Sequence, residues 1–350
     1  MTQAKLKEQA ILVSGGAGFV GSNLVKRMLE LGAAKVHIVD NLLSAERVNV
    51  PDDPRVMLSQ TSITDDALLA SLGDEYDYAF HLCTYHGNQS SIHDPIADHE
   101  NNTLTTLKLY ERIKEFKQLK KVVYSSAGCS VAAKTFETAS ATEETDIVAL
   151  KQDSPYSMSK IFGEFYSVYY FNHHQLPTVR ARFQNVYGPG EILGAGRWRG
   201  TPATVWRNVT PTFIFKALNR ETLPLENEGI ATRDFIYVTD VADGLIACAL
   251  NGQAGEAYNI ASGNETSIRE LADRINSLTG NTAGVRHLPK RLWDNSGRRF
   301  GSTEKAAREL GFRAQVEIED GLTRAVDWTK KNLALIKATI AKHDRFMRAA

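Results

Sequence analysis

The 350-residue chain has only three cysteines, Cys83, Cys129 and Cys248, and they lie far apart in the sequence. This number and spacing exclude a disulfide framework and a CxxC metal site, and free thiols are typical of a reducing compartment. Long apolar runs are also missing, and residues 1–9 lack the apolar core of a secretory signal. We therefore expect a cytoplasmic protein that does not enter a membrane.

An excess of one charge is absent as well. The 41 basic residues equal the 41 acidic residues, so no basic surplus is available to neutralise a nucleic-acid backbone. The histidines at positions 86, 93 and 99 lack metal-ligand spacing on one helix face, and we expect no metal. What remains is a composition with 43% hydrophobic and 23% charged residues, which is typical of a soluble globular protein.

Short apolar runs alternate with helical patterns through the first half of the chain. The pattern predicts strands at residues 10–13, 35–39, 56–58, 78–82, 121–124 and 178–183. Helices are predicted at residues 24–29, 104–116 and 157–174. Strands that alternate with helices predict an α/β fold, a Rossmann-type doubly wound parallel sheet.

A glycine-rich turn separates the first predicted strand from the first predicted helix. Gly15, Gly18 and Gly21 have GxxGxxG spacing, which permits a tight turn, a close approach of backbone amides to a pyrophosphate, and close packing of helix on strand. Asp40 ends the next strand, nineteen residues after Gly21. A carboxylate there can accept hydrogen bonds from ribose hydroxyls and would repel a 2′-phosphate, so NAD is preferred to NADP.

A tyrosine and a lysine four residues apart open the long helical pattern at residues 157–174. Tyr156 and Lys160 should lie on one face of that helix. An unperturbed tyrosine has a pKa of about 10 and is a poor base at neutral pH. A neighbouring ammonium favours the phenolate, which makes Tyr156 a candidate base for a sugar hydroxyl and Lys160 the group that tunes it.

The motifs together resemble the extended short-chain dehydrogenase/reductase family, in particular its NAD-dependent nucleotide-sugar epimerases and dehydratases. The resemblance runs from Ile11 to about Trp328. It is carried by Gly15 to Gly21, His81-Leu82, Tyr124-Ser125-Ser126, Tyr156-Ser157-Met158-Ser159-Lys160, Asn185-Val186-Tyr187-Gly188-Pro189 and Arg233-Asp234-Phe235-Ile236-Tyr237-Val238.

The resemblance implies a set of cofactor and substrate contacts. For NAD these are Gly15, Gly18, Phe19, Val20, Gly21, Asp40, Asn41, Ser62, Ile63, Leu82, Thr84, Asn101, Tyr156 and Lys160, where Ser62 replaces the more usual aspartate. For the nucleotide sugar they are Asn185, Arg199, Asn208, Arg233 and Arg299.

The resemblance also implies a domain plan. An NAD-binding Rossmann domain is expected at residues 1–184, with residues 232–262 returning to it. A smaller, interleaved C-terminal substrate domain is expected at residues 185–231 and 263–335, followed by a C-terminal helix or tail at residues 336–350. The aromatic residues at 166 and 169–171, together with the helix at 104–116, could form the dimer face seen in relatives, so we expect a homodimer.

The chain departs from its relatives after Tyr124. Without a gap, the position of the catalytic Ser or Thr falls on Ala127, whereas a shift of one residue restores it to Ser126, which we favour over Ser125. The ungapped alignment also places Cys129 where the 4,6-dehydratases have a glutamate and the GDP-mannose 3,5-epimerases a cysteine. Cys129 is therefore either an acid/base group for a ring carbon or a small buried filler.

These features predict an NAD-dependent nucleotide-sugar epimerase, with UDP favoured as the nucleotide and surface polysaccharide (lipopolysaccharide) synthesis as the pathway. The sugar would be oxidised at C4, inverted at C4 or at C5 or C3, and reduced again. One alternative is a 4,6-dehydratase or decarboxylase of the same family. An alternative of another class is a non-catalytic NAD-binding member, although such members tend to lose the tyrosine and lysine that this chain keeps as Tyr156 and Lys160.

Overall fold

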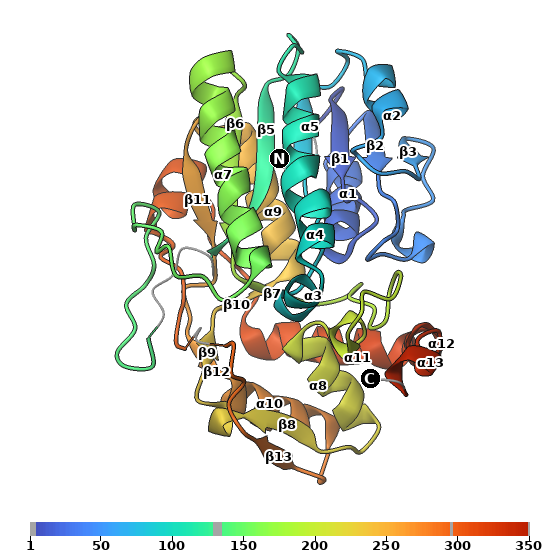
Figure 1. Cartoon of the computed structure of the whole chain (residues 1–350), viewed down its shortest axis with the longest axis vertical. Helices are drawn as coiled ribbons and strands as arrows, with labels where there is room; N and C mark the ends of the chain where they lie inside the picture. The colour runs from blue at the N-terminus through green and yellow to red at the C-terminus, as the bar shows by residue number, and fades with distance from the viewer. Residues whose placement is uncertain (1–4, 129–134, 295–296, 349–350) are drawn as a thin grey trace.

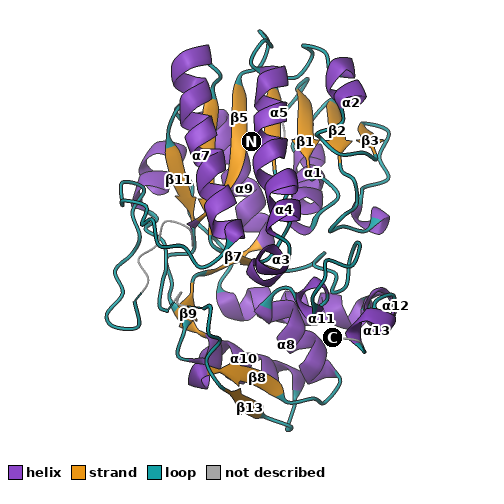
Figure 2. Ribbon diagram, viewed as in Figure 1, coloured by secondary structure: helices purple, strands orange, loops and turns teal. Residues whose placement is uncertain are grey.

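Seven parallel strands form the central sheet of the protein, in the order β11-β6-β5-β4-β1-β2-β3. The computed structural model describes residues 5–128, 135–294 and 297–348. The sheet strands are β1 (Ala10–Ser14), β2 (Lys35–Val39), β3 (Val56–Ser59), β4 (Tyr78–His81), β5 (Lys121–Ala127), β6 (Thr178–Phe183) and β11 (Ala257–Ile260). This sheet confirms the predicted Rossmann-type α/β fold (Figures 1 and 2).

Helices cover both faces of the sheet. They are α1 (Phe19–Glu30), α2 (Asp66–Ser71), α3 (Asn88–His93), α4 (Pro95–Asp98), a π-helical segment (His99–Thr103), α5 (Leu104–Ile113), α7 (Pro155–His174) and α9 (Val238–Asn251). Strand β1 shows why both faces are buried. Ile11 and Val13 belong to the core cluster with α1 and α9, whereas Leu12 points the other way, into the cluster with α2, α5 and α7.

The long helix α7 begins two residues before the predicted start at residue 157. Pro155 occupies its first turn, where the missing N–H costs nothing, and the side chain of Ser154 accepts a hydrogen bond from the backbone N–H of Ser157. This cap fixes the helix start, so Tyr156 lies in the first turn of the helix, at its end nearest the smaller layer (Figure 1).

A smaller layer lies below the carboxyl ends of the strands in Figure 1. Its elements are α8 (Val209–Leu218), β8 (Leu223–Glu226), α10 (Ile268–Thr279), β13 (Val285–Leu288) and α11 (Ile318–Lys331). They enclose their own apolar cluster, to which Phe213, Leu271 and Leu322 contribute. Strands β8 and β13 pair in parallel at one side of this layer.

Short pairs of strands connect the two layers. They are β7 (Asn185–Tyr187) with β10 (Phe235–Tyr237), and β9 (Thr232–Arg233) with β12 (Thr266–Ser267). Residues 306–310 form a π-helical turn. Helices α12 (Leu333–Ala341) and α13 (Asp344–Met347) then pack beside residues 192–195, where Ile336 contacts a separate apolar cluster. The predicted domain boundaries stay a prediction.

Candidate active site

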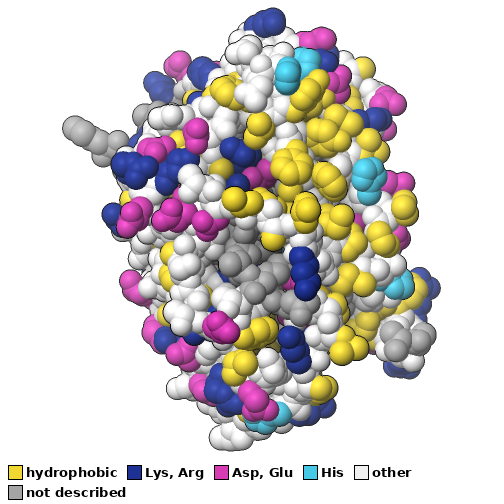
Figure 3. Space-filling view, turned by 60° about the vertical axis from the view of Figure 1, so that its left-hand side comes forward, with side chains coloured by type: hydrophobic (Ala, Val, Ile, Leu, Met, Phe, Trp, Pro, Cys, Tyr) yellow, Lys and Arg dark blue, Asp and Glu magenta, His cyan; other side chains and the backbone are white. Residues whose placement is uncertain are grey.

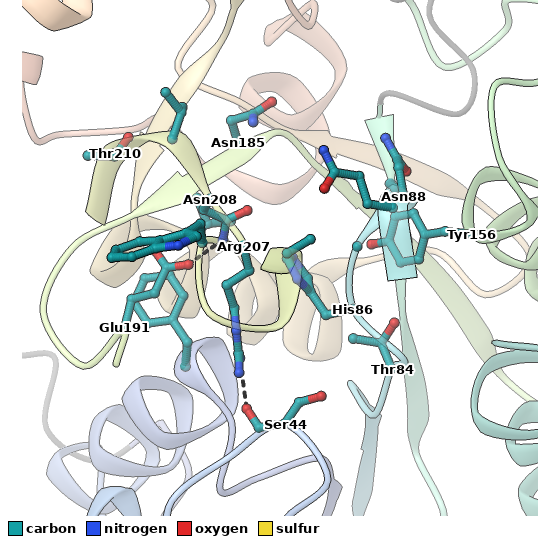
Figure 4. Close-up of a pocket in the computed structure, with 18 of the residues that line it drawn as sticks. Ser44, Thr84, His86, Asn88, Tyr156, Asn185, Glu191, Arg207, Asn208 and Thr210 are labelled. Atoms are coloured by element: carbon teal, nitrogen blue, oxygen red, sulfur yellow. Dashed lines mark hydrogen bonds between the residues drawn. The ribbon is translucent and has the colours of Figure 1, made fainter. Parts of the chain in front are cut away.

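A cavity of about 790 Å³ lies where the carboxyl ends of the sheet strands face the smaller layer (Figure 4). The predicted site residues that line it are Gly15, Gly18, Phe19, Val20, Gly21, Asp40, Asn41, Ser62, Ile63, Leu82, Thr84, Asn101, Ser126, Tyr156, Lys160, Asn185, Asn208, Arg233 and Arg299. Arg199 lies outside this lining, and Cys129 lies outside the described residues. The fold therefore brings together residues from almost the whole length of the chain.

The glycine-rich turn leaves space for a ligand at one glycine and none at the other two. Gly15 has φ +81°, and a Cβ there would lie 2.5 Å from the backbone nitrogen of Cys83. A Cβ on Gly21 would lie 2.2 Å from the carbonyl oxygen of Gly15. At Gly18 the nearest described atom would be that same oxygen, at 3.2 Å. Helix α1 begins directly after Gly18, and Phe19 and Val20 of its first turn line the cavity, which is where a helix can bind a pyrophosphate.

Asp40 joins this turn to the loop that follows β2. Its carboxylate accepts hydrogen bonds from the backbone N–H of Ala17 at 3.0 Å and from that of Leu42 at 2.9 Å. Burial raises the pKa of Asp40, and the backbone donors oppose the rise. The backbone N–H of Gly18 is a third donor to this carboxylate. An ionised carboxylate has about four acceptor positions, so about one remains for a ribose hydroxyl. The turn and the acid therefore fit an NAD molecule.

Tyr156 and Lys160 lie together at the end of β5. The Nζ atom of Lys160 lies 5.9 Å from the centroid of the Tyr156 ring. The same ammonium donates to the carbonyl oxygen of Ser125 at 2.8 Å and to its Oγ at 3.3 Å. Lys160 is only 4% exposed, so its charge acts on the tyrosine through a medium of low dielectric constant.

The two serines and the alanine at the end of β5 differ in their surroundings. The hydroxyl of Ser126 donates to the Glu164 carboxylate, which also pairs with Arg182. Ser125 contacts Lys160, and Ala127 lines the cavity without a hydroxyl. The catalytic role predicted for Ser126 stays a prediction. To bind a substrate oxygen, the Ser126 hydroxyl would have to give up its hydrogen bond to Glu164.

A buried polar network supports the cavity wall from behind. His81 contacts the Ser14 hydroxyl at 2.7 Å through Nδ1 and the Thr106 hydroxyl at 2.9 Å through Nε2. Burial, and then the charge of Lys160, lower the pKa of His81 to about 3. A neutral imidazole with a hydrogen-bond partner on each ring nitrogen holds the neighbouring side chains in place.

The opposite wall is formed by residues from the smaller layer. Asn208 donates from Nδ2 to the Glu191 carboxylate, and the bond is drawn in Figure 4. Arg233 donates to the backbone carbonyl oxygens of Thr232 and Gly297 at 2.6 and 2.9 Å. Arg299 has a buried Nε atom without a partner among the described residues. Two arginines and an amide on one wall suit a diphosphate.

Many lining residues were not selected from the sequence as ligand contacts, and His86, Glu191 and Arg207 are three of them. His86 lies between Arg207 and Tyr156 in Figure 4, and its ring centroid is 6.2 Å from that of the tyrosine. Burial, and then the cations Arg207, Arg199 and Lys160, lower the pKa of His86 to about 3. Burial raises the pKa of Glu191 to about 7. Arg207 directly precedes Asn208, and that adjacency was the one available sequence signal.

Neither a metal-ligand cluster nor a membrane-spanning helix occurs in the described part of the chain. Within residues 5–128, 135–294 and 297–348, no cluster of three or more potential metal ligands occurs. In that same part of the chain, no helix is both long and apolar enough to cross a membrane.

A dinucleotide turn, a ribose acid and a tyrosine–lysine pair in one cavity define a nicotinamide-dependent enzyme of the short-chain dehydrogenase/reductase class. Residues 11–261 match the NAD dependent epimerase/dehydratase family. The chain belongs to this family. The predicted family and the predicted cofactor, NAD, are thereby confirmed.

Individual relatives include epimerases and dehydratases. WbmF of Bordetella bronchiseptica, solved with NAD+ and UDP, is 70% identical with a TM-score of 0.90, and the match covers 99% of each chain. UDP-glucose 4-epimerase of Mycolicibacterium smegmatis is 30% identical over 324 residues, which cover 91% of this chain and 97% of the relative. DesIV, a dTDP-glucose 4,6-dehydratase of Streptomyces venezuelae, is 27% identical with a TM-score of 0.84, and the match covers 94% of this chain and 99% of DesIV.

Proposed function

We propose that the protein is an NAD-dependent nucleotide-sugar epimerase that acts on a UDP-sugar in the cytoplasm, for surface polysaccharide synthesis. The observation that carries this proposal is the placement of Tyr156 and Lys160 in one cavity with the dinucleotide turn. The similarity to WbmF, which was solved with UDP, and to a UDP-glucose 4-epimerase supports the nucleotide and the reaction.

The chemistry assigned to the chain's own residues is proton transfer and charge stabilisation. Tyr156, as the phenolate, accepts the proton of the C4 hydroxyl, and the Lys160 ammonium lowers the cost of that phenolate. Bound NAD supplies the hydride acceptor at C4 and the hydride for the final reduction. The tyrosine O–H then donates to the oxygen of the sugar ketone and returns its proton when the ketone is reduced.

Two routes of inversion follow from the ketone. Reduction on its other face gives inversion at C4. A ketone at C4 also acidifies the protons on C3 and C5, so a base beside the ring could invert one of those carbons. For the second route we propose Cys129, on the resemblance to the 3,5-epimerases alone.

The runner-up is a 4,6-dehydratase or decarboxylase, which the similarity to DesIV supports. Ala127 and Gly128 stand where the dehydratases carry the first residues of their Thr-Asp/Ser-Glu signature. Without a carboxylic acid there, the group that would protonate a leaving hydroxyl is missing, and the epimerase is the better supported function.

Incubation with UDP-hexoses and UDP-hexuronic acids in heavy water, followed by NMR, tests the proposal. Inversion at C4 without deuterium supports the first route, and deuterium at C5 or C3 supports the second. Loss of water or carbon dioxide from the sugar would establish the runner-up. No change in any UDP-sugar, with NAD still bound, would overturn catalysis and favour a binding protein. The Tyr156→Phe variant is the negative control.

We also propose a homodimer, formed through α7. Its outward face carries Met158, Phe162, Phe165 and Tyr169, each between 44% and 59% exposed. Their spacing places them along one stripe of the helix, and Figure 3 shows hydrophobic side chains gathered on this side of the molecule. Tyr170, which the sequence grouped with this face, is instead buried against Tyr110.

A further inference from the structure

Three arginines from one segment bond to the loop that follows Asp40. We call residues 40–46 the cofactor loop and residues 193–207 the arginine segment. Arg197 donates from its backbone N–H to the Leu43 carbonyl oxygen at 3.0 Å and from Nη2 to that of Asn41 at 3.0 Å. The two stretches lie about 150 residues apart in the sequence, so only the fold brings them together.

The other two arginines extend the same contact. Arg199 donates from Nη1 to the Ser44 hydroxyl at 3.0 Å and to the Leu43 carbonyl oxygen at 3.3 Å. Arg207 donates from Nη1 to the Ser44 carbonyl oxygen at 2.9 Å, the bond drawn in Figure 4. All three cations therefore bond to oxygens of the cofactor loop.

The backbones of the segment and the loop approach closely. Gly196 has φ +82°, and a Cβ there would lie 2.2 Å from the carbonyl oxygen of Leu43. Its N–H donates to the Glu46 carboxylate at 2.9 Å. Only glycine permits this approach, and so a shift of the arginine segment would move the cofactor loop with it.

Helices α12 and α13 brace the arginine segment from outside. The Thr339 hydroxyl donates to the Leu193 carbonyl oxygen at 2.8 Å, and Nε2 of His343 lies 2.8 Å from the Gly194 carbonyl oxygen. The Trp198 ring stacks on Phe346, with centroids 5.2 Å apart and an interplanar angle of 10°. In Figure 1 these helices lie beside the arginine segment, below the loop after β2.

The arginines have hydrogen-bonding capacity left over. Among the described residues, no carboxylate forms an ion pair with Arg199 or Arg207, and the Nε atoms of both are buried without a partner. Burial, and then the charge of Arg207, lower the pKa of Arg199 to about 9. Buried cations of this kind are stabilised by an anion, and Arg207 lines the cavity.

We propose that Arg197, Arg199 and Arg207 are positioning residues that clamp the cofactor loop onto bound dinucleotide, with α12–α13 as the brace and Arg207 directed to a diphosphate. The clamp rests on the proposed function only in taking NAD as the dinucleotide. A nucleotide sugar also carries a diphosphate, so the experiment distinguishes NAD from the nucleotide sugar as the ligand of Arg207.

The experiment measures NAD release from the purified holoenzyme and the Kd of UDP for Arg207→Gln and Trp198→Ala. We expect NAD release about tenfold faster in each, the equivalent of about 1.4 kcal/mol, with the Kd of UDP within about twofold of wild type. Arg220→Gln is the matched control, because Arg220 also donates to backbone carbonyls, of Thr279 and Gly280, but away from the cavity.

Hydrogen exchange provides a readout that does not depend on turnover. In Trp198→Ala, amides of residues 41–45 should exchange faster, whereas those of β8 should not. Weakened UDP binding with unchanged NAD release would assign Arg207 to the sugar nucleotide and overturn the clamp. Equal weakening of NAD and UDP binding, or the same weakening of NAD binding in Arg220→Gln, would mean that the substitutions only destabilise the protein in general, and this would also overturn the clamp. Absence of epimerase activity with an intact NAD effect would defeat the proposed function and leave the clamp standing.

Discussion

Lys160 donates from Nζ to the backbone carbonyl oxygen of Ser125 at 2.8 Å, which ties the first turns of α7 to the carboxyl end of β5. This bond fixes the ammonium relative to the sheet rather than to the helix alone. Because Lys160 is buried, its charge stays close to the Tyr156 ring, which is the arrangement that the proposed proton transfer requires.

Removal of either member of this pair should abolish most of the turnover. Tyr156→Phe loses the proton acceptor, and Lys160→Met loses the charge that favours the phenolate, so kcat should fall about 100- to 10,000-fold, the range typical of general acid–base groups. Lys160→Met should also move the ascending limb of the pH–rate profile, on which Tyr156 loses its proton, to higher pH, because the phenolate then forms less readily. If Tyr156→Phe kept the kcat of the wild type, the proposed mechanism would be wrong.

Gly18 and Gly21 of the dinucleotide turn should differ in how they tolerate alanine. Gly21→Ala places a Cβ 2.2 Å from a backbone oxygen, so the melting temperature should fall by several degrees, as a loss of about 1–3 kcal/mol implies. Gly18→Ala meets protein only at 3.2 Å and should keep the fold while NAD binding weakens. Calorimetry of unfolding and NAD titration measure the two effects. Equal loss of stability in Gly18→Ala and Gly21→Ala would contradict the view that Gly18, unlike Gly21, is required for ligand binding rather than for packing.

Glu191 should make stability depend on pH near neutrality. Its pKa is about 7 in the folded protein against an ordinary value of 4.5. Between these values the unfolded chain has lost a proton that the folded chain keeps, so stability falls as pH rises from about 4.5 to about 7, by up to about 3 kcal/mol. Denaturant titrations of wild type and Glu191→Gln should diverge over this range, and parallel curves would contradict the assignment.

Glu191 should also affect ligand binding, because its carboxylate contacts Asn208. Above about pH 7 the ionised carboxylate repels a diphosphate, so the Kd of UDP should rise with pH in the wild type. In Glu191→Gln, which keeps an oxygen to accept from Asn208, this pH dependence should flatten. If the Kd of UDP in Glu191→Gln kept the wild-type pH dependence, the diphosphate would not bind near Glu191.

The apolar face of α7 should determine the oligomeric state. Phe165→Glu places a charge where the proposed partner helix packs, so sedimentation velocity should show a monomer with unchanged helix content. Ile147→Glu is the control, because Ile147 is 93% exposed and lies outside α7. A Phe165→Glu protein that sediments like wild type would exclude this face as the interface.

The alternation of strands and helices, the glycine spacing and the Tyr156–Lys160 spacing were sufficient to predict the α/β fold, and the glycine-rich turn and the tyrosine–lysine pair both line the same cavity. These features are local: they depend on residues within a few positions of each other, and a parallel sheet then brings the strand ends to one edge. For the same reason Asp40 could be assigned from its position after the second strand.

Only the tertiary structure decided which cations reach which oxygens. The guanidinium of Arg199 bonds to the cofactor loop, while Arg207 lines the cavity. The sugar contact predicted for Arg199 stays a prediction. The bracing of residues 193–200 by α12–α13 was likewise invisible, because it depends on contacts across about 150 residues of sequence. Such contacts arise from packing between layers, which local periodicity does not predict. Tyr156 and Lys160, by contrast, lie about one helical turn apart, so their spacing could be read from the sequence alone.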